Sequence, residues 1–142
     1  MAGTLLHATC VAIDGRGVLL TGRPGSGKSD LALRLIDRGA RLVSDDGTVV
    51  EARAFRLFAC APATIVGKIE VRGLGILEVP AVDQVPLCLT VALDRTPPRM
   101  PDDPLPTDMI AGLTLPALAL APFEASAPVK IEQALLMYGL PA

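Results

Sequence analysis

One short, glycine-rich segment is the part of the sequence best suited to holding phosphate. Glycines let successive backbone N–H groups turn towards a phosphate without Cβ clashes, and the N-terminus of a following helix adds its positive dipole. The segment satisfies the pattern G-x-x-x-x-G-K-[ST] and consists of Gly22, Arg23, Pro24, Gly25, Ser26, Gly27, Lys28 and Ser29. Lys28 supplies a mobile charge for the β- and γ-phosphates, and the Ser29 hydroxyl can bind Mg²⁺. The pattern predicts binding of a nucleoside triphosphate, and it disfavours the alternative of a simple turn before a capped helix.

Two adjacent carboxylates, Asp45 and Asp46, follow a predicted strand at Arg41 to Ser44. Carboxylates at the carboxyl end of a strand can serve a metal ion and a hydroxyl proton separately. The alternative is a simple Asp-Asp-Gly turn, which the three residues alone would favour. Because a phosphate loop is also present, we favour the interpretation that the two carboxylates take part in catalysis or metal binding.

Further candidate groups lie at Glu70 and Arg72, beside flexible glycines, and at the single histidine, His7. A strand pair with a bulge also explains the first two, and a lone histidine is more often packed or solvated than catalytic. Asp94 follows an apolar run in the form of a Walker B strand. On the motif alone, Asp94 is the favoured metal ligand.

The elements that must position these groups alternate between strands and helices. The apolar residue Leu35 and its neighbours at helical spacing predict a helix from Lys28 to Arg38, ended by Gly39. The other expected elements are a hairpin of Leu5 to Ile13 with Val18 to Thr21, a second hairpin turning at Asp46-Gly47 towards Thr48 to Val50, strands at Phe55 to Cys60, within Lys68 to Val79, at Leu87 to Leu93 and at Leu113 to Leu120, a proline-rich loop at Thr96 to Thr107, and a C-terminal helix with Pro128 in its first turn. This order predicts an α/β fold with a sheet of mixed strand direction.

The composition restricts the class of protein. The chain has 142 residues, a formal net charge of −2 and 51% hydrophobic residues, which fits one domain and excludes intrinsic disorder. With no basic stripe and an aromatic content of 3%, nucleic-acid binding is not expected. No apolar run is long enough to span a membrane and no signal peptide is evident. Three cysteines without disulfide or metal spacing indicate reduced thiols in a cytoplasmic protein.

These segments together resemble the C-terminal catalytic domain of the bacterial HPr kinase/phosphorylase family. The resemblance covers nearly the whole chain and rests on His7, the phosphate loop, the segment from Arg38 to Asp46, and the signature from Ile69 to Gly75. It implies a P-loop kinase domain like the nucleotide domain of phosphoenolpyruvate carboxykinases. It also implies one catalytic domain over residues 1–142, in a short form without the regulatory N-terminal domain.

The resemblance assigns roles to individual residues. Asp46 would accept the proton of a substrate serine, with His7 close by to help hold its charge state. Lys28 would grip the β- and γ-phosphates, while Ser29 and Glu70 would hold Mg²⁺, so that Asp94 merely caps a core strand. Arg99 would steady the transferring phosphoryl group. The implied activity is ATP- and Mg-dependent serine phosphorylation of an HPr-type phosphocarrier of the phosphotransferase system, which regulates carbon and nitrogen metabolism.

The chain departs from the family pattern in one segment. The family carries a basic segment linked to phosphate removal, but residues 114–120 contain no arginine. The sequence therefore predicts the kinase direction only. A small-molecule kinase and a nucleotide-binding signalling module without turnover are the competing interpretations.

The C-terminal residues suggest self-association. Apolar side chains at Leu136, Met137, Tyr138 and Leu140 could form an interface. The family resemblance suggests a homo-oligomer, specifically a hexamer.

Overall fold

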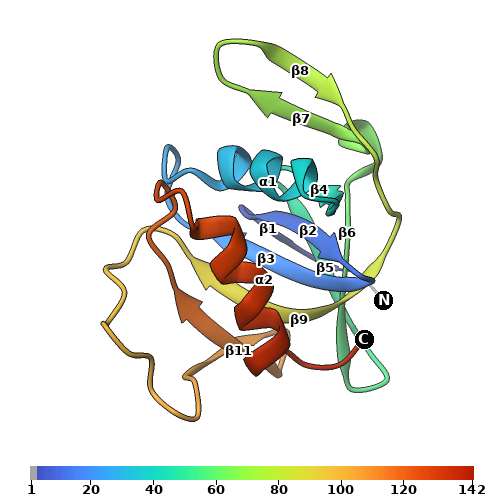
Figure 1. Ribbon diagram of the computed structural model, residues 1–142. Helices are drawn as coiled ribbons and strands as arrows, with labels where there is room; N and C mark the ends of the chain where they lie inside the picture. The colour runs from blue at the N-terminus through green and yellow to red at the C-terminus, as the bar shows by residue number, and fades with distance from the viewer. Residues whose placement is uncertain (1–2) are drawn as a thin grey trace.

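The computed structural model describes residues 3–142 as an α/β fold with a curved, mixed sheet, which confirms the predicted fold class (Figure 1). The strands are β1 (Thr4–Leu6), β2 (Thr9–Ile13), β3 (Arg16–Thr21), β4 (Arg41–Ser44), β5 (Thr48–Arg53), β6 (Arg56–Cys60), β7 (Lys68–Val71), β8 (Gly75–Glu78), β9 (Val85–Ala92), β10 (Thr107–Ile110) and β11 (Leu113–Ala119). The helices are α1 (Lys28–Asp37) and α2 (Ala127–Tyr138), with a 3₁₀ turn at Ala63–Ile65.

Strand β9 joins the two parts of the main sheet. Its first residues pair with β6 in antiparallel fashion, and the rest of the strand runs parallel to β3 and β11. The strand order is β1-β5-β6-β9-β3-β2-β4, so β1 and β2 lie five strands apart. In a flat sheet that separation would be about 24 Å, which the two-residue link between β1 and β2 could not span. The sheet must therefore bend until its two parts face each other.

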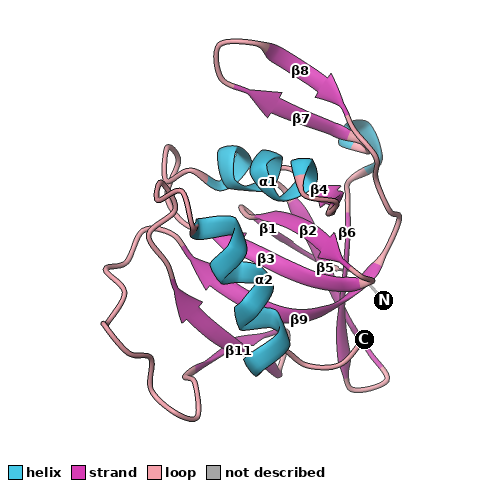
Figure 2. Ribbon diagram, in the orientation of Figure 1, coloured by secondary structure: helices cyan, strands magenta, loops and turns pink. Residues whose placement is uncertain are grey.

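Both faces of the central strands are buried. On β3, Leu19 faces the apolar cluster between the two parts of the sheet, whereas Val18 and Leu20 face the cluster under the helices. Figure 2 shows α1 and α2 packed against this sheet. Burial on both faces explains why β9 is a nearly continuous apolar run, as the sequence predicted.

Helix α1 forms as expected and presents its first residues to the phosphate loop. Leu31, Ala32 and Leu35 are buried on its inner face. Its end is marked by Gly39, whose φ of +111° suits glycine, and whose N–H bonds to the Ile36 carbonyl. At the other end of the chain, Pro128 lies in the first turn of α2, also as predicted.

The hairpin expected at Asp46-Gly47 is wrong. Strand β4 pairs with β2, whereas β5 pairs with β1 and β6 in the other part of the sheet. The chain turns at Asp46, with a φ of +52°, and the Ser44 hydroxyl donates to the Gly47 carbonyl. The Thr48 hydroxyl also donates to the Ala8 carbonyl at 2.8 Å. These side-chain hydrogen bonds stabilise the segment in which the chain passes from one part of the sheet to the other. The Asp-Gly signal had instead predicted a hairpin in which the two neighbouring strands pair with each other.

Two further boundaries differ from the sequence prediction. The strand expected over Leu5 to Ile13 is interrupted at His7 and Ala8, where the chain bends from β1 into β2. Strand β10 forms a hairpin with β11 and was not predicted as a strand, because its exposed residues follow the proline-rich loop directly. Within residues 3–142, neither helix is long and apolar enough to cross a membrane.

A small separate hairpin, β7–β8, stands on the far side of α1 from the main sheet (Figure 1). Ile69 is fully buried and anchors the hairpin to the core beneath α1. Glu70 and Arg72 are thereby carried to the N-terminal end of α1, which is where the phosphate loop ends.

Candidate active site

The phosphate loop connects β3 to α1 and requires glycine at its critical positions. Gly27 caps α1 with a φ of +98°, and a Cβ there would lie 3.0 Å from the ring of Phe123. At Gly22 a Cβ would collide with the side chain of Ser26. The Ser26 hydroxyl is itself buried without a hydrogen-bond partner among the described residues. A buried, unpaired hydroxyl within a glycine cradle fits a loop built to receive an anion.

Lys28 lies folded across this loop. Only 7% of its surface is exposed, and its ammonium donates to the carbonyls of Gly22 at 2.7 Å and Arg23 at 3.2 Å. Its Nζ also lies 3.9 Å from the Asp46 carboxylate. The loop's own carbonyls thus satisfy a buried charge and hold it beside the site that a triphosphate would occupy.

The structure gives the two adjacent carboxylates different surroundings. Asp45 accepts hydrogen bonds from the Ser29 hydroxyl at 2.5 Å, from the Thr9 hydroxyl at 3.2 Å and from the Glu70 N–H at 2.9 Å. Asp46 keeps its side chain 69% exposed, and its N–H donates to the Thr9 hydroxyl at 3.0 Å. Asp45 therefore joins four elements, whereas Asp46 faces the cavity and remains free to meet a substrate.

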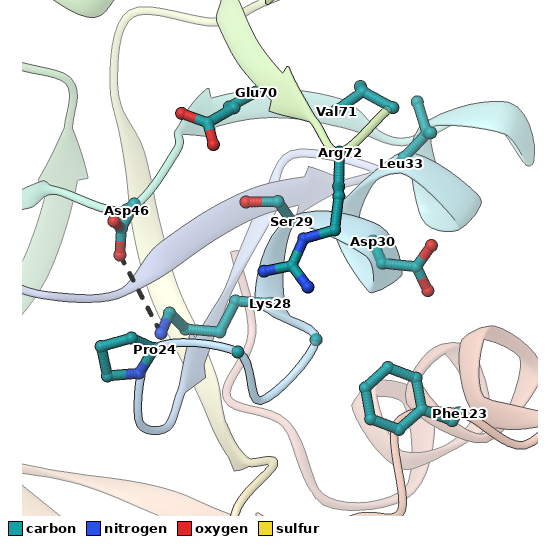
Figure 3. Close-up of a pocket in the computed structure, with 12 residues that line it drawn as sticks. Pro24, Lys28, Ser29, Asp30, Leu33, Asp46, Glu70, Val71, Arg72 and Phe123 are labelled. Carbon is teal, nitrogen blue, oxygen red and sulfur yellow. Dashed lines mark ion pairs between the residues drawn. The ribbon is translucent and has the colours of Figure 1, made fainter. Parts of the chain in front are cut away.

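A cavity of about 460 Å³ lies above the N-terminus of α1, between the phosphate loop and the β7–β8 hairpin (Figure 3). Its size is in the usual range for small-ligand sites. It is lined by Pro24, Gly25, Gly27, Lys28, Ser29, Asp30, Leu33, Asp46, Glu70, Val71, Arg72 and Phe123. The cavity thus brings together the phosphate loop, Asp46 and Glu70, which are far apart in the sequence.

The oxygen donors at this site fit Mg²⁺ bound together with phosphates. The Ser29 hydroxyl and the Glu70 carboxylate line the same cavity, and Asp45 holds both residues. Residues 3–142 contain no group of three or more His, Cys, Asp or Glu side chains that could hold a metal ion by themselves. Mg²⁺ is usually bound by one or two protein oxygens with substrate phosphates and water, so this donor set is adequate.

Asp94 binds the phosphate loop. Its carboxylate accepts the N–H of Arg23 at 3.1 Å and lies 3.7 Å from the Nε of that arginine. Among the described residues, Asp94 is outside the set that lines the cavity. This geometry fits an anchor at the end of β9 better than a metal ligand.

His7 and Arg99 are exposed, and the lining set drawn from residues 3–142 includes neither of them. His7 lies on the link between β1 and β2, two residues from Thr9, whose hydroxyl contacts the Asp46 backbone. Arg99 lies in the proline-rich loop between β9 and β10. Neither His7 nor Arg99 therefore lines the cavity in this structure, and the roles predicted for them stay predictions.

Arg72 and Phe123 are among the cavity residues that were given no specific role from the sequence. The guanidinium of Arg72 extends towards Lys28 and Ser29 (Figure 3), and its position in the Glu-Val-Arg-Gly segment was the available signal. Phe123 lies beside the phosphate loop from a segment remote in sequence, and no pattern indicated it.

Fold and site define a phosphate-loop α/β domain with an acidic residue facing the phosphate position. Residues 1–83 match the family model described as HPr Serine kinase C-terminal domain. The chain belongs to this family, and the matched part contains the phosphate loop, both aspartates, Glu70 and Arg72.

Individual relatives agree with this assignment. The structure of the Hpr(Ser) kinase/phosphatase from Coxiella burnetii superposes with a TM-score of 0.81 at 32% identity, covering 94% of this chain and 95% of that one. The HPr kinase/phosphorylase of Clostridium tetani is 46% identical over 79 residues, which is 56% of this chain and 26% of the relative. That of Clostridium beijerinckii is 47% identical over 76 residues, or 54% and 25% of the two chains. The matched part therefore spans about a quarter of these curated relatives.

Proposed function

We propose that this domain is an ATP- and Mg-dependent protein kinase that phosphorylates a serine of an HPr-type phosphocarrier protein of the phosphotransferase system. The observation that carries the proposal is the pair of Lys28 and Asp46, 3.9 Å apart in a cavity lined by the phosphate loop. One group is suited to phosphate and the other to a hydroxyl proton. Family membership and the printed names of the relatives supply the protein substrate.

The proposed reaction needs few groups. The loop N–H groups and Lys28 hold the triphosphate, and the serine hydroxyl approaches in line from the side of Asp46. As the bond from the serine oxygen to the γ-phosphorus forms, the bond from that phosphorus to the β–γ bridging oxygen breaks, and the hydroxyl proton passes to Asp46. With 69% of its side chain exposed, Asp46 is accessible to a serine on another protein. Ser29 and Glu70 would hold Mg²⁺, which when bound neutralises charge on the phosphates.

The negative charge on the transferring γ-phosphoryl group also needs a cationic side chain to stabilise it. Arg99 is the family-based candidate, whereas Arg72 is the arginine that lines the cavity. We therefore include Arg72 beside Arg99 in this role. His7 is proposed to help position Asp46 through the adjoining link to Thr9.

We further propose that the activity runs in the kinase direction. Strand β11 keeps its place beside β9 and β10, but its segment 114–120 contains no arginine to support phosphate removal.

Residues 1–142 are proposed to act as one catalytic domain within a homo-oligomer, and the family resemblance points to a hexamer. Leu136 and Met137 on α2 are 72% and 67% exposed, and these side chains offer an apolar contact. A cytoplasmic location fits the free state of Cys10, Cys60 and Cys88.

The variant Asp46→Asn tests the mechanism, because it keeps the size of the side chain and removes its basicity. It should bind ATP within about twofold of the original chain, while transfer of labelled γ-phosphate to an HPr-type carrier falls by about 10²- to 10⁴-fold. Asp83→Asn is the matched control, since Asp83 is exposed and lies outside the cavity lining. Undiminished transfer by Asp46→Asn would exclude Asp46 as the base. Label appearing on a small molecule, or ATP binding without any transfer, would favour the competing interpretations.

A further inference from the structure

The cavity has two chemically different ends. Asp46 and Glu70 lie at one end, near Lys28, and Phe123 lies at the other (Figure 3). If the γ-phosphate faces Asp46, as the proposed function requires, the nucleoside must extend towards the opposite end. There the lining includes the aromatic side chain of Phe123.

Phe123 is an exposed aromatic residue on a firmly held backbone. Phe123 is 69% exposed, and it belongs to neither of the two apolar clusters that the described residues form. The Arg34 guanidinium donates to the carbonyl of Pro122 and, at 3.2 Å, to that of Glu124, so both flanking residues are tied to α1. Arg34 is in turn paired with Asp30 at 2.9 Å.

The ring is held directly beside the phosphate loop. A Cβ built at Gly27 would lie 3.0 Å from two of its atoms, so the ring and the loop backbone are in close contact. An aromatic face next to a phosphate cradle offers a stacking surface for a base, and stacking needs no particular pattern of base hydrogen bonds.

We propose that Phe123 is the stacking platform for the nucleobase of the bound nucleoside triphosphate. This inference rests on the proposed function, because it takes the direction of the nucleotide from the position of Asp46. It assigns the otherwise unexplained exposed ring to base recognition and leaves the phosphates to the loop.

The test compares a ligand that has a base with one that lacks it. Dissociation constants for a non-hydrolysable ATP analogue and for inorganic tripolyphosphate are measured by calorimetry, with Mg²⁺, on the unaltered chain and on Phe123→Ala. The substitution should weaken binding of the ATP analogue about tenfold and leave tripolyphosphate binding within about twofold. Phe123→Tyr keeps the ring face and should restore affinity for the ATP analogue.

Phe55→Ala is the matched control, because Phe55 is 93% exposed in the turn between β5 and β6 and lies outside the cavity lining. The stacking role is overturned if Phe123→Ala leaves the ATP analogue unaffected, or if it weakens both ligands equally. If the unaltered chain binds neither ligand, the proposed kinase function fails and the subsite fails with it. If the unaltered chain binds both ligands and Phe123→Ala binds them with the same affinities, the result contradicts the proposed base subsite and leaves the proposed kinase function standing.

Discussion

The hydroxyl of Ser29 donates a hydrogen bond to the carboxylate of Asp45 at 2.5 Å. This contact joins the first turn of α1 to the end of β4. Because the other oxygen of Asp45 accepts the N–H of Glu70, the same side chain also sets the position of β7. The two residues proposed to hold Mg²⁺ are therefore connected through one carboxylate that the reaction itself does not consume.

Substituting Asp45 should weaken metal binding without removing a direct ligand. In Asp45→Ala, the Ser29 hydroxyl and the Glu70 N–H lose their shared acceptor, and the Mg²⁺ concentration needed for half-maximal ATP binding should rise about 10- to 100-fold. Loss of the hydrogen bonds should also lower the free energy of unfolding by about 1–3 kcal/mol. Magnesium titrations and urea unfolding measure the two effects. An unchanged magnesium requirement would show that Asp45 is not a support for the metal site.

A comparison of Glu70→Gln with Asp94→Ala separates the two candidate metal carboxylates. Glu70→Gln should raise the magnesium requirement by about tenfold or more, because it removes a charged oxygen donor from the cavity. Asp94→Ala should leave that requirement unchanged and weaken nucleotide binding several-fold at saturating Mg²⁺, because the Arg23 N–H loses its acceptor. The reverse pattern would make Asp94 the metal ligand and return the site to the Walker B interpretation.

Stability should fall at alkaline pH because of a buried thiol. Burial, with a smaller contribution from neighbouring Cys88, raises the pKa of Cys10 far above its ordinary value of 9.0. Below pH 9 the Cys10 thiol is protonated in both the folded and the unfolded chain, and its contribution to the free energy of unfolding is fully present. Above it, only the unfolded chain ionises, so the free energy of unfolding falls by up to about 1.4 kcal/mol per pH unit for this thiol.

Urea unfolding at several pH values between 7 and 10.5 measures this slope. Cys10→Ala should show a shallower decline than the unaltered chain. Burial also raises the pKa of Cys60, but Cys60 is only partly buried, and Cys60→Ala should alter the slope less. Parallel stability curves for all three chains would contradict the burial of Cys10 in the folded state.

Charge introduced on α2 should disrupt self-association. Met137→Glu places a carboxylate on a residue that is 67% exposed, so the fold should persist while any assembly through this face becomes smaller in sedimentation experiments. Phe55→Glu, on a remote exposed residue, is the control and should leave the assembly unchanged. An unaffected assembly would place the interface elsewhere.

Local features of the fold were predictable from the sequence. The phosphate loop, α1 and its Gly39 ending depend on neighbouring residues, and the structure confirms them. The turn at Asp46-Gly47 was misread because the partners of β4 and β5 lie in different parts of the sheet, which no local signal reveals.

In the candidate active site, too, the features set by neighbouring residues were predicted, and those set by residues distant in the sequence were not. The phosphate loop, Asp46 and Glu70 were identified, and the structure brings them into one cavity. The different surroundings of Asp45 and Asp46 depend on a positive φ at Asp46 and on contacts from distant elements. Phe123 was not identified because it reaches the phosphate loop only through tertiary packing, in which the segment before α2 lies against α1.

The most direct test of the central claim follows the phosphoryl group itself. The unaltered protein is incubated with Mg²⁺, ATP labelled at the γ-phosphate and a purified HPr-type carrier, and the modified residue is located by mass spectrometry. The account predicts label on a single seryl side chain of the carrier, absent when Asp46→Asn replaces the unaltered protein. A carrier that stays unlabelled while the protein binds ATP, or label on any residue other than serine, would contradict it.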